Sequence, residues 1–294
     1  MRINIYTSLN GVGLEKDYLI LKQVFEAAGH SVGVADYFQR RMRPDKADVA
    51  IHLEIPRFDL MSIAKVNYMM PNPEWFMSDW MRQLNRFNAI LCKTHDCVNV
   101  FSGTGKAIYI GFTSMDFYRP MKKSKQMIHI QGKSDFKGTG EILQAYQKAE
   151  LPRLFLLSKK PHADTRNVVN AGFLSDDDFS KLINCCMIHL CPSLYEGYGH
   201  YIWEAMSCGN VVITTNAAPM NEFITDDRFL VETNKPWRHH QGTMHPPLVD
   251  SLVDVIGRVA AMDEAELLKV GEHNRAAYLA NDAAFRERIL NVIS

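Results

Sequence analysis

The chain has 294 residues, of which 47% are hydrophobic and 22% charged, a composition typical of a soluble globular protein with room for two domains. Its 33 Lys and Arg balance its 33 Asp and Glu, so it lacks the overall positive field that attracts nucleic acid or an anionic membrane. Six cysteines without a C-x-x-C pair predict reduced core thiols and a cytoplasmic location. No apolar stretch reaches the ~20 residues of a membrane-spanning helix, and the N-terminal residues predict a strand, not a signal peptide.

The first half of the chain predicts a βαβ unit followed by further strands. Ile3 and Ile5 begin a strand, a helix ends at Gly29, and a second strand covers 31–35. The helix has an apolar stripe at spacings of three and four residues: Leu14, Tyr18, Leu21, Phe25 and Ala28. Further strands are predicted at 48–53, 66–69 and 89–92. In a parallel α/β sheet, ligands bind at the carboxyl ends of the strands.

A rigid loop at 71–75 follows one of these strands. Such loops line binding clefts, so Asn72 and Glu74 are predicted to contact a substrate, the acceptor or else the donor; a helix cap before 75–84 is the alternative.

The glycines of the first loop support a competing interpretation. Gly11 and Gly13, with Asp36 at the end of the second strand, resemble half of a dinucleotide fingerprint, as in an NAD-dependent oxidoreductase. The third glycine is absent because position 16 is Lys, so the fingerprint is incomplete.

The second half again alternates strands with helices. Strands are predicted at 127–130 and 154–157, and a helix begins near Thr139. A short connection is expected at 168–172, and three amphipathic helices at 250–261, 263–279 and 283–293. The loop at 236–247, with three histidines and Trp237, is either an acceptor-side insertion or a solvated surface loop.

No metal site is predicted. Asp176 and Asp178 form an Asp-x-Asp, but they follow Ser175 at a helix start, where acidic residues cap the helix. No His or Cys spacing indicates zinc.

The most informative stretch is 190–224, which predicts a strand, a glycine turn, a short helix and a second buried strand. Pro192 and Ser193 end an apolar run, Glu196 opens a tight turn, and the helix covers 200–207 before a left-handed stop at Gly209. A helix start suits a phosphate, because its first N–H groups are unpaired and carry partial positive charge. Glu196 precedes that start and Glu204 follows it by about one turn, a separation of roughly 12 Å if the segment were all helix. Two carboxylates flanking a phosphate site fit a nucleotide-sugar, whose hydroxyls a carboxylate binds well.

This stretch resembles the signature of retaining glycosyltransferases of the GT-B fold (glycosyl transferases group 1). The matching features are Pro-Ser at 192–193, Glu-Gly-Tyr-Gly at 196–199, Glu-Ala-Met at 204–206 and Gly209, with Glu196 and Glu204 as the E-x7-E pair. A plain strand–turn–helix with solvated acids is the alternative. The resemblance implies two Rossmann-like α/β domains facing each other across a cleft. It also implies transfer of a sugar from a UDP- or GDP-type donor to an acceptor hydroxyl with retained configuration, without metal or cofactor.

The resemblance also indicates domain boundaries. Residues 108–120 resemble the family's interdomain linker, so we expect an N-terminal, acceptor-side domain at 1–112 and a donor domain at 113–280. A C-terminal helix at 281–294 is expected to cross back to the N-terminal domain.

Site residues follow from the same resemblance. Lys133 and Lys137 match two cations that bind the donor diphosphate, although the family has Arg at the first, so a bidentate contact is lost. Glu196 is expected to orient the sugar and Glu204 to hold the ribose. Glu222 is expected near the nucleotide, as its equivalent is in relatives, with a helix-capping role as the alternative. His52 and Glu54 occupy a strand end that reaches the sugar in relatives, with a packed histidine as the alternative. Other donor contacts are expected from Gly13, Gly197, Tyr198, Gly199, His200 and Tyr201.

The acceptor class and the oligomeric state remain open. A saccharide, a lipid, a protein or a modified DNA base is compatible with the chain, the last because Arg40, Arg41 and Arg43 cluster locally. A non-catalytic sugar-nucleotide binding module is a further alternative.

Overall fold

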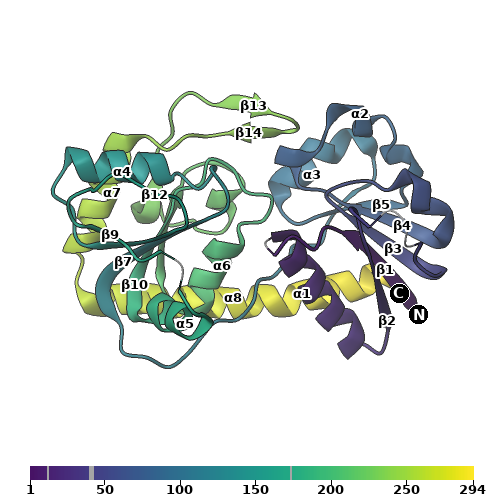
Figure 1. Ribbon diagram of the computed structural model, residues 1–294, viewed down its shortest axis with the longest axis horizontal. Helices are drawn as coiled ribbons and strands as arrows, with labels where there is room; N and C mark the ends of the chain where they lie inside the picture. The colour runs from purple at the N-terminus through teal and green to yellow at the C-terminus, as the bar shows by residue number, and fades with distance from the viewer. Residues whose placement is uncertain (12, 40–42, 173) are drawn as a thin grey trace. The chain divides into compact units, whose positions relative to one another are not determined.

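The computed structural model of the protein describes residues 1–11, 13–39, 43–172 and 174–294 (Figure 1). They form two compact units. Unit 1 comprises Met1–Ser114, Arg238–Thr243 and Asn281–Ser294; unit 2 comprises Met115–Trp237 and Met244–Ala280. The domain boundaries expected from sequence, at 112/113 and 280/281, refer to independently folding domains and stay predictions.

Unit 1 is built on a parallel sheet whose described strands have the order β2-β1-β3-β4-β5-β6. The strands are β1 (Arg2–Thr7), β2 (Ser31–Asp36), β3 (Ala47–Leu53), β4 (Ala64–Met70), β5 (Ala89–Cys92) and β6 (Ala107–Tyr109). The helices are α1 (Gly13–Ala27), α2 (Ser78–Met81) and α3 (His95–Phe101), with 3-10 turns η1 (Phe58–Ile63), η2 (Pro73–Trp75), η3 (Leu84–Arg86) and η4 (Ser102–Thr104). All neighbouring strands pair in parallel, so their carboxyl ends share one edge.

Apolar runs explain why these strands form. β5 is buried at all four positions, as expected of a strand covered on both faces of a parallel sheet. Its Ile90 packs with three phenylalanines from the connecting turns and α3, Phe76, Phe87 and Phe101.

Unit 2 contains a second parallel sheet, with the described strands ordered β12-β11-β10-β7-β8-β9. The strands are β7 (Ser124–Gly132), β8 (Leu154–Ser158), β9 (Val168–Asn170), β10 (Cys186–Cys191), β11 (Val211–Thr215) and β12 (Leu230–Val231). The helices are α4 (Thr139–Lys148), α5 (Asp176–Cys185), α6 (His200–Ser207) and α7 (Val249–Ala261), with 3-10 turns η5 (Met220–Glu222) and η6 (Asp227–Phe229). β13 (Trp237–His239) and β14 (Gly242–Met244) form a hairpin, and α8 (Glu264–Ile293) contributes residues to both units.

Two sequence-based expectations were wrong. The segment at 168–172 is not merely a connection, because β9 pairs with β8 at the sheet edge. The two helices expected at 263–279 and 283–293 are one continuous helix, α8. Residues 280–282 contain no Pro or Gly to break it, and an ion pair between Arg286 and Asp282, 2.8 Å apart, bridges one turn just beyond the expected gap.

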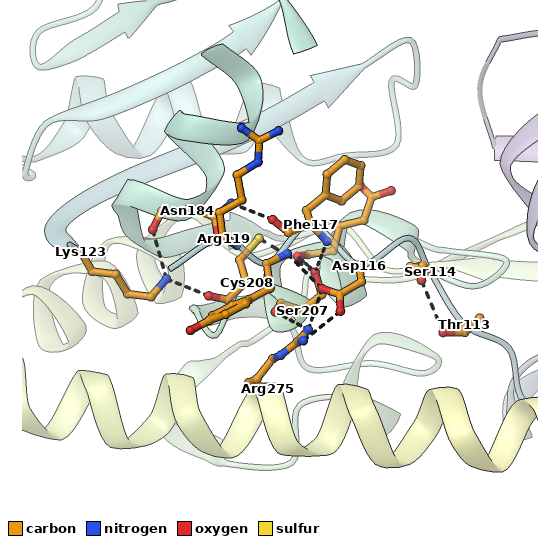
Figure 2. Close-up of polar contacts among 12 residues, drawn as sticks. Thr113, Ser114, Asp116, Phe117, Arg119, Lys123, Asn184, Ser207, Cys208 and Arg275 are labelled. Atoms are coloured by element: carbon orange, nitrogen blue, oxygen red, sulfur yellow. Dashed lines mark hydrogen bonds and ion pairs between the residues drawn. The ribbon is translucent and has the colours of Figure 1, made fainter. Parts of the chain in front are cut away.

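Figure 2 shows how the segment before β7 is fastened within unit 2. The Phe117 amide donates to Ser207 Oγ at 3.1 Å, and the Arg119 amide donates to Asn184 Oδ1 at 2.9 Å. The Lys123 ammonium donates to the Asn184 and Cys208 carbonyls, which lie at the C-terminal ends of α5 and α6. Lysine therefore caps two helix ends whose carbonyls would otherwise be unpaired.

In the part of the chain described here, no helix combines the length and the apolar character that crossing a membrane requires.

Candidate functional site

The predicted strand–turn–helix–strand at the carboxyl edge of the unit 2 sheet is confirmed as β10, the turn at 192–199, α6 and β11. Gly199 adopts φ +83°, a left-handed conformation that glycine accepts without strain, and is the N-cap of α6. The Thr215 hydroxyl, at the end of β11, donates to the Ser193 carbonyl at 2.6 Å. The turn that precedes α6 is therefore held between the ends of β10 and β11.

Lys137 meets Glu196 at this turn. Lys137 Nζ lies 2.6 Å from Glu196 Oε1, and the two side chains are 16% and 13% exposed. The Ser193 hydroxyl donates to the same carboxylate oxygen, and the Tyr201 hydroxyl hydrogen-bonds Ser193. The ammonium also lies 3.6 Å from the centre of the Tyr201 ring, a cation–π contact. The carboxylate and the cation are thus fixed in position next to a helix N-terminus, yet both remain partly accessible.

A close approach of two backbones places Lys137. The next residue, Gly138, has φ +69°, and a Cβ there would lie 2.1 Å from the Pro192 carbonyl oxygen. The Leu194 amide donates to the Phe136 carbonyl at 2.8 Å. The loop before α4 therefore packs directly on the turn, at a distance only glycine allows.

A buried histidine, His129, connects the end of β10 with the start of α4. His129 Nδ1–H donates to the Leu190 carbonyl at 2.7 Å, and its Nε2 accepts from the Thr139 hydroxyl at 2.8 Å. Burial lowers the pKa of His129 to about 4, so the ring is neutral at pH 7 and these two bonds fix its tautomer.

The other predicted donor residues occupy mixed environments. Lys133 is exposed directly after β7, and Glu204 is only 3% exposed within α6. Tyr198 is buried and stacks on Trp203 with ring centroids 6.0 Å apart; His200 meets the Tyr198 ring edge-on. Burial raises the pKa of Tyr201 well above its usual range. Gly197 is buried in the same turn. Whether these groups contact a donor stays a prediction.

His52 has the environment of a packed core histidine. It is fully buried, its Nδ1 accepts from the Arg57 amide at 2.9 Å, and its Nε2–H donates to Asn67 Oδ1 at 3.2 Å. The ring lies between Tyr6 and Phe87, with centroids 4.7 and 5.0 Å away. Burial lowers its pKa to about 4. Because both nitrogens are occupied, we leave His52 out of the proposed mechanism.

In the glycine loop of unit 1, a backbone amide is already bound by a carboxylate of the chain, that of Glu15. The Gly11 amide donates to Glu15 Oε2 at 2.6 Å, so a carboxylate lies close to the start of α1. A phosphate at Gly13 would meet that negative charge, which disfavours both donor binding there and the dinucleotide alternative. Position 12 of this loop lies outside the described residues, as do Arg40 and Arg41 of the basic cluster suggested for DNA.

Asn72 joins a buried polar network that sequence analysis missed. Lys93 Nζ donates to Asp17 Oδ2 at 2.6 Å and to Asn72 Oδ1 at 3.0 Å. The side-chain nitrogen of Asn72, Nδ2, donates to Glu54 Oε2 at 2.9 Å. Asn72 therefore does not cap a helix with its side chain. Glu74, on the following turn, is buried. One signal was readable beforehand, because Asp17 is an acid within the apolar stripe of the first helix.

Clusters of three or more His, Cys, Asp or Glu side chains suited to a metal ion do not occur among the described residues. Asp176 and Asp178 lie in the first turn of α5, where Ser175 Oγ accepts from the Asp178 amide at 3.2 Å, so the predicted capping role is confirmed.

A hollow of about 630 Å³ lies in unit 2 at the other edge of the sheet, where β7 begins and α6 ends. Two of its cations are already engaged. Lys123 donates to helix-end carbonyls, and Arg275 pairs with Asp116 at 2.7 Å and donates to the Ser207 carbonyl at 2.8 Å (Figure 2).

The fold defined by these two units is shared with solved glycosyltransferases of the GT-B class. A glycosyltransferase from Rickettsia africae superposes with a TM-score of 0.75 at 11% identity, covering 99% of this chain and 97% of that one. The Anabaena protein HepE, solved in complex with UDP, gives a TM-score of 0.72 at 14% identity, with 99% of each chain covered. The predicted α/β fold class is confirmed.

Sequence comparison finds a family match for a segment that lies mostly in unit 2. Residues 122–240 match the family described as Glycosyl transferases group 1, a segment that contains Lys133, Lys137, Glu196 and Glu204. The serotype-specific mannosyltransferase WbdA of Escherichia coli is 30% identical over 115 residues, which are 38% of this chain and 14% of WbdA. The chain therefore matches only a small part of that relative's length.

Proposed function

We propose that the protein is a glycosyltransferase that moves a sugar from a nucleotide-sugar to an acceptor hydroxyl. The single observation that carries this proposal is the ion pair of Lys137 and Glu196 at the N-terminus of α6. It combines a cation and a helix dipole, which suit a diphosphate, with a carboxylate that suits sugar hydroxyls. The family match over 122–240 covers both residues.

The chemical task is to stabilise a diphosphate leaving group as its negative charge grows. Lys137 has three N–H donors, so it can keep one bond to Glu196 and donate the others to phosphate oxygens. Lys133 and the amides of 199–201 supply further donors. Removing one such donor typically raises the barrier by ~3 kcal/mol.

Glu196 has the role of a positioning carboxylate in this mechanism. One oxygen accepts hydrogen bonds from Lys137 and Ser193, which keeps the carboxylate oriented. The other oxygen is assigned to a sugar hydroxyl. We assign Glu204 to the ribose hydroxyls and expect retention of configuration without a covalent intermediate. UDP- and GDP-type donors are both compatible, and the UDP bound to HepE supports testing UDP first.

The decisive experiment measures nucleoside diphosphate release from a panel of UDP- and GDP-sugars, with and without a broad acceptor panel. Titration calorimetry with UDP and GDP reports binding separately. Lys137→Ala and Glu204→Ala should each abolish donor binding or turnover. Lys148→Ala is the matched control, because Lys148 forms an exposed pair with Asp250 that contributes little.

Three outcomes would redirect the proposal. Full activity in Lys137→Ala or Glu204→Ala would remove the site assignment. Donor binding without hydrolysis or transfer would favour a binding module. A thermal shift with NAD, and none with UDP or GDP, would favour an oxidoreductase. With an active donor, the anomeric configuration of the product by NMR tests retention.

A further inference from the structure

The buried network of unit 1 joins four side chains from four different segments. Asp17 lies on α1, Glu54 follows β3, Asn72 follows β4, and Lys93 follows β5. The side chains of Lys93 and Asp17 are 3% and 2% exposed, and the ammonium also lies 5.1 Å from the centre of the Phe112 ring. Because β3, β4 and β5 are parallel neighbours, the three residues that follow them gather at the carboxyl edge, where α/β folds bind ligands.

The network has a defined polarity. Lys93 can only donate, so Asn72 must turn its carbonyl oxygen toward Lys93 and its amide nitrogen toward Glu54. Glu54 Oε2 therefore accepts a bond from Asn72. Among the residues that the structure describes, Glu54 Oε1 has no hydrogen-bond partner, and Glu54 itself is only partly buried. Glu54 is therefore a partly exposed end of the network, whereas Lys93 and Asp17 are enclosed.

Glu54 also has an unusual backbone. Its φ is +63°, in the left-handed region that a residue with a Cβ rarely adopts. Strain of this kind persists where the surroundings enforce it, and it is concentrated at functional sites. A buried Lys–Asp pair is itself a weak source of stability, because desolvation offsets the attraction. Stability alone therefore gives little reason for this arrangement.

An aromatic surface lies on the same turn. Trp75 comes three residues after Asn72 and is 44% exposed, and its ring meets His239 edge-on at 5.8 Å. The Gln241 amide donates to the Pro73 carbonyl at 3.1 Å, so the hairpin residues 238–243 pack on this turn within unit 1. The carboxylate that accepts from Asn72, and the exposed indole three residues further along that loop, are groups that suit a saccharide, which has hydroxyl donors and apolar C–H faces.

We propose that Glu54 recognises a saccharide acceptor by accepting a hydrogen bond from one of its hydroxyls at Oε1. Asn72, Lys93 and Asp17 are positioning residues that hold Glu54 in place. This inference rests on the proposed function and names the acceptor class and residues of that reaction.

The test uses methyl α-D-mannopyranoside as a probe acceptor and Glu54→Gln as the main variant. Probe affinity is measured by saturation-transfer NMR, and the acceptor KM and kcat by diphosphate release. Losing a charge-assisted hydrogen bond should raise the probe Kd and the acceptor KM about tenfold to a hundredfold. UDP and GDP binding should stay unchanged, because neither nucleotide carries the sugar or the acceptor. Glu26→Gln is the control, since Glu26 is exposed on α1 and 3.9 Å from Lys22.

A second readout separates positioning from a merely structural role. Burial raises the pKa of Glu54, and the Asn72 hydrogen bond opposes that rise. Lys93 also lowers this pKa, and Asp17 raises it. Probe binding should therefore weaken as the pH falls through the Glu54 pKa. Asn72→Ala removes a hydrogen bond that lowers this pKa, so in that variant the loss of binding should begin at a higher pH.

The outcomes are separable. Equal probe affinity in Glu54→Gln, Glu26→Gln and the wild type would overturn the proposal, as would identical pH limbs in Asn72→Ala and the wild type. Absence of probe binding to the wild type would overturn the saccharide class. If the wild type binds neither UDP nor GDP, the proposed function is wrong. The NMR measurement of probe binding would still decide the role of Glu54 in that case.

Discussion

Gly138→Ala should disrupt unit 2 far more than its size suggests. Alanine at φ +69° costs ~1 kcal/mol of backbone strain, and its Cβ would lie 2.1 Å from the Pro192 carbonyl oxygen. That contact is to backbone, so the loop before α4 must shift by about 1 Å, and overpacking of this kind costs ~1–3 kcal/mol. We expect a loss of about 2–4 kcal/mol in the free energy of unfolding. The same shift would separate Lys137 from Glu196 and weaken diphosphate binding.

Gly140→Ala is the matched control, two residues further along. It lies within α4, and a Cβ there meets nothing within 4 Å. Helix propensity predicts that it raises the free energy of unfolding by about 0.5–1 kcal/mol. Urea unfolding of both variants, with titration of UDP and GDP, measures the contrast. If Gly138→Ala unfolds at the same urea concentration as Gly140→Ala, the account of how Lys137 is positioned is wrong.

Two further predictions concern buried charge. Lys93→Met should lower the free energy of unfolding by ~3–5 kcal/mol in urea melts, because it leaves the Asp17 carboxylate buried without its cation; a loss below about 1 kcal/mol would contradict this. Burial lowers the pKa of His52 and His129 to about 4 and of His189 to about 3, from 6.5 in the unfolded chain. As the pH falls, the unfolded chain therefore binds protons before the folded protein does. The free energy of unfolding has its full value above pH ~6.5, and it decreases toward pH 4 by up to about 1.4 kcal/mol per pH unit for each histidine. Urea unfolding across this pH range should show that slope, His129→Gln should make it shallower, and a flat profile would refute it.

The sequence predicted what is encoded locally. The apolar run before Pro192, the glycine at 199 and the β-branched run after Gly209 each specify their own element, and all of these elements form. The split of α8 was mispredicted, since the three residues between the two expected helices include no helix breaker. Pattern alone therefore placed the turn before α6 but not every helix end.

Long-range partners could not be derived in the same way. The ion pair of Lys137 with Glu196 was not predicted. The family resemblance assigned both residues to the donor, but 59 residues separate them and no periodicity connects them. The Asp17–Lys93 pair spans 76 residues and depends on strand order, which places β5 two strands from β3 and three from β1. An acid within an apolar stripe indicates that a buried partner exists, but it does not say which residue that partner is.

The Lys137–Glu196 and Lys93–Asp17 pairs differ in exposure, and this difference separates what each lysine can do. Each pair has its nitrogen and oxygen 2.6 Å apart, but Lys137 and Glu196 are 16% and 13% exposed, whereas Lys93 and Asp17 are 3% and 2% exposed. A lysine that water can reach can exchange or share its partner with an incoming phosphate, because the charge left behind is solvated. A fully enclosed pair cannot do so without leaving a bare buried charge, at a cost of several kcal/mol. Lys137 is therefore suited to bind a ligand that comes and goes, while Lys93 can act only through what it holds in place, which is Asn72 and, beyond it, Glu54.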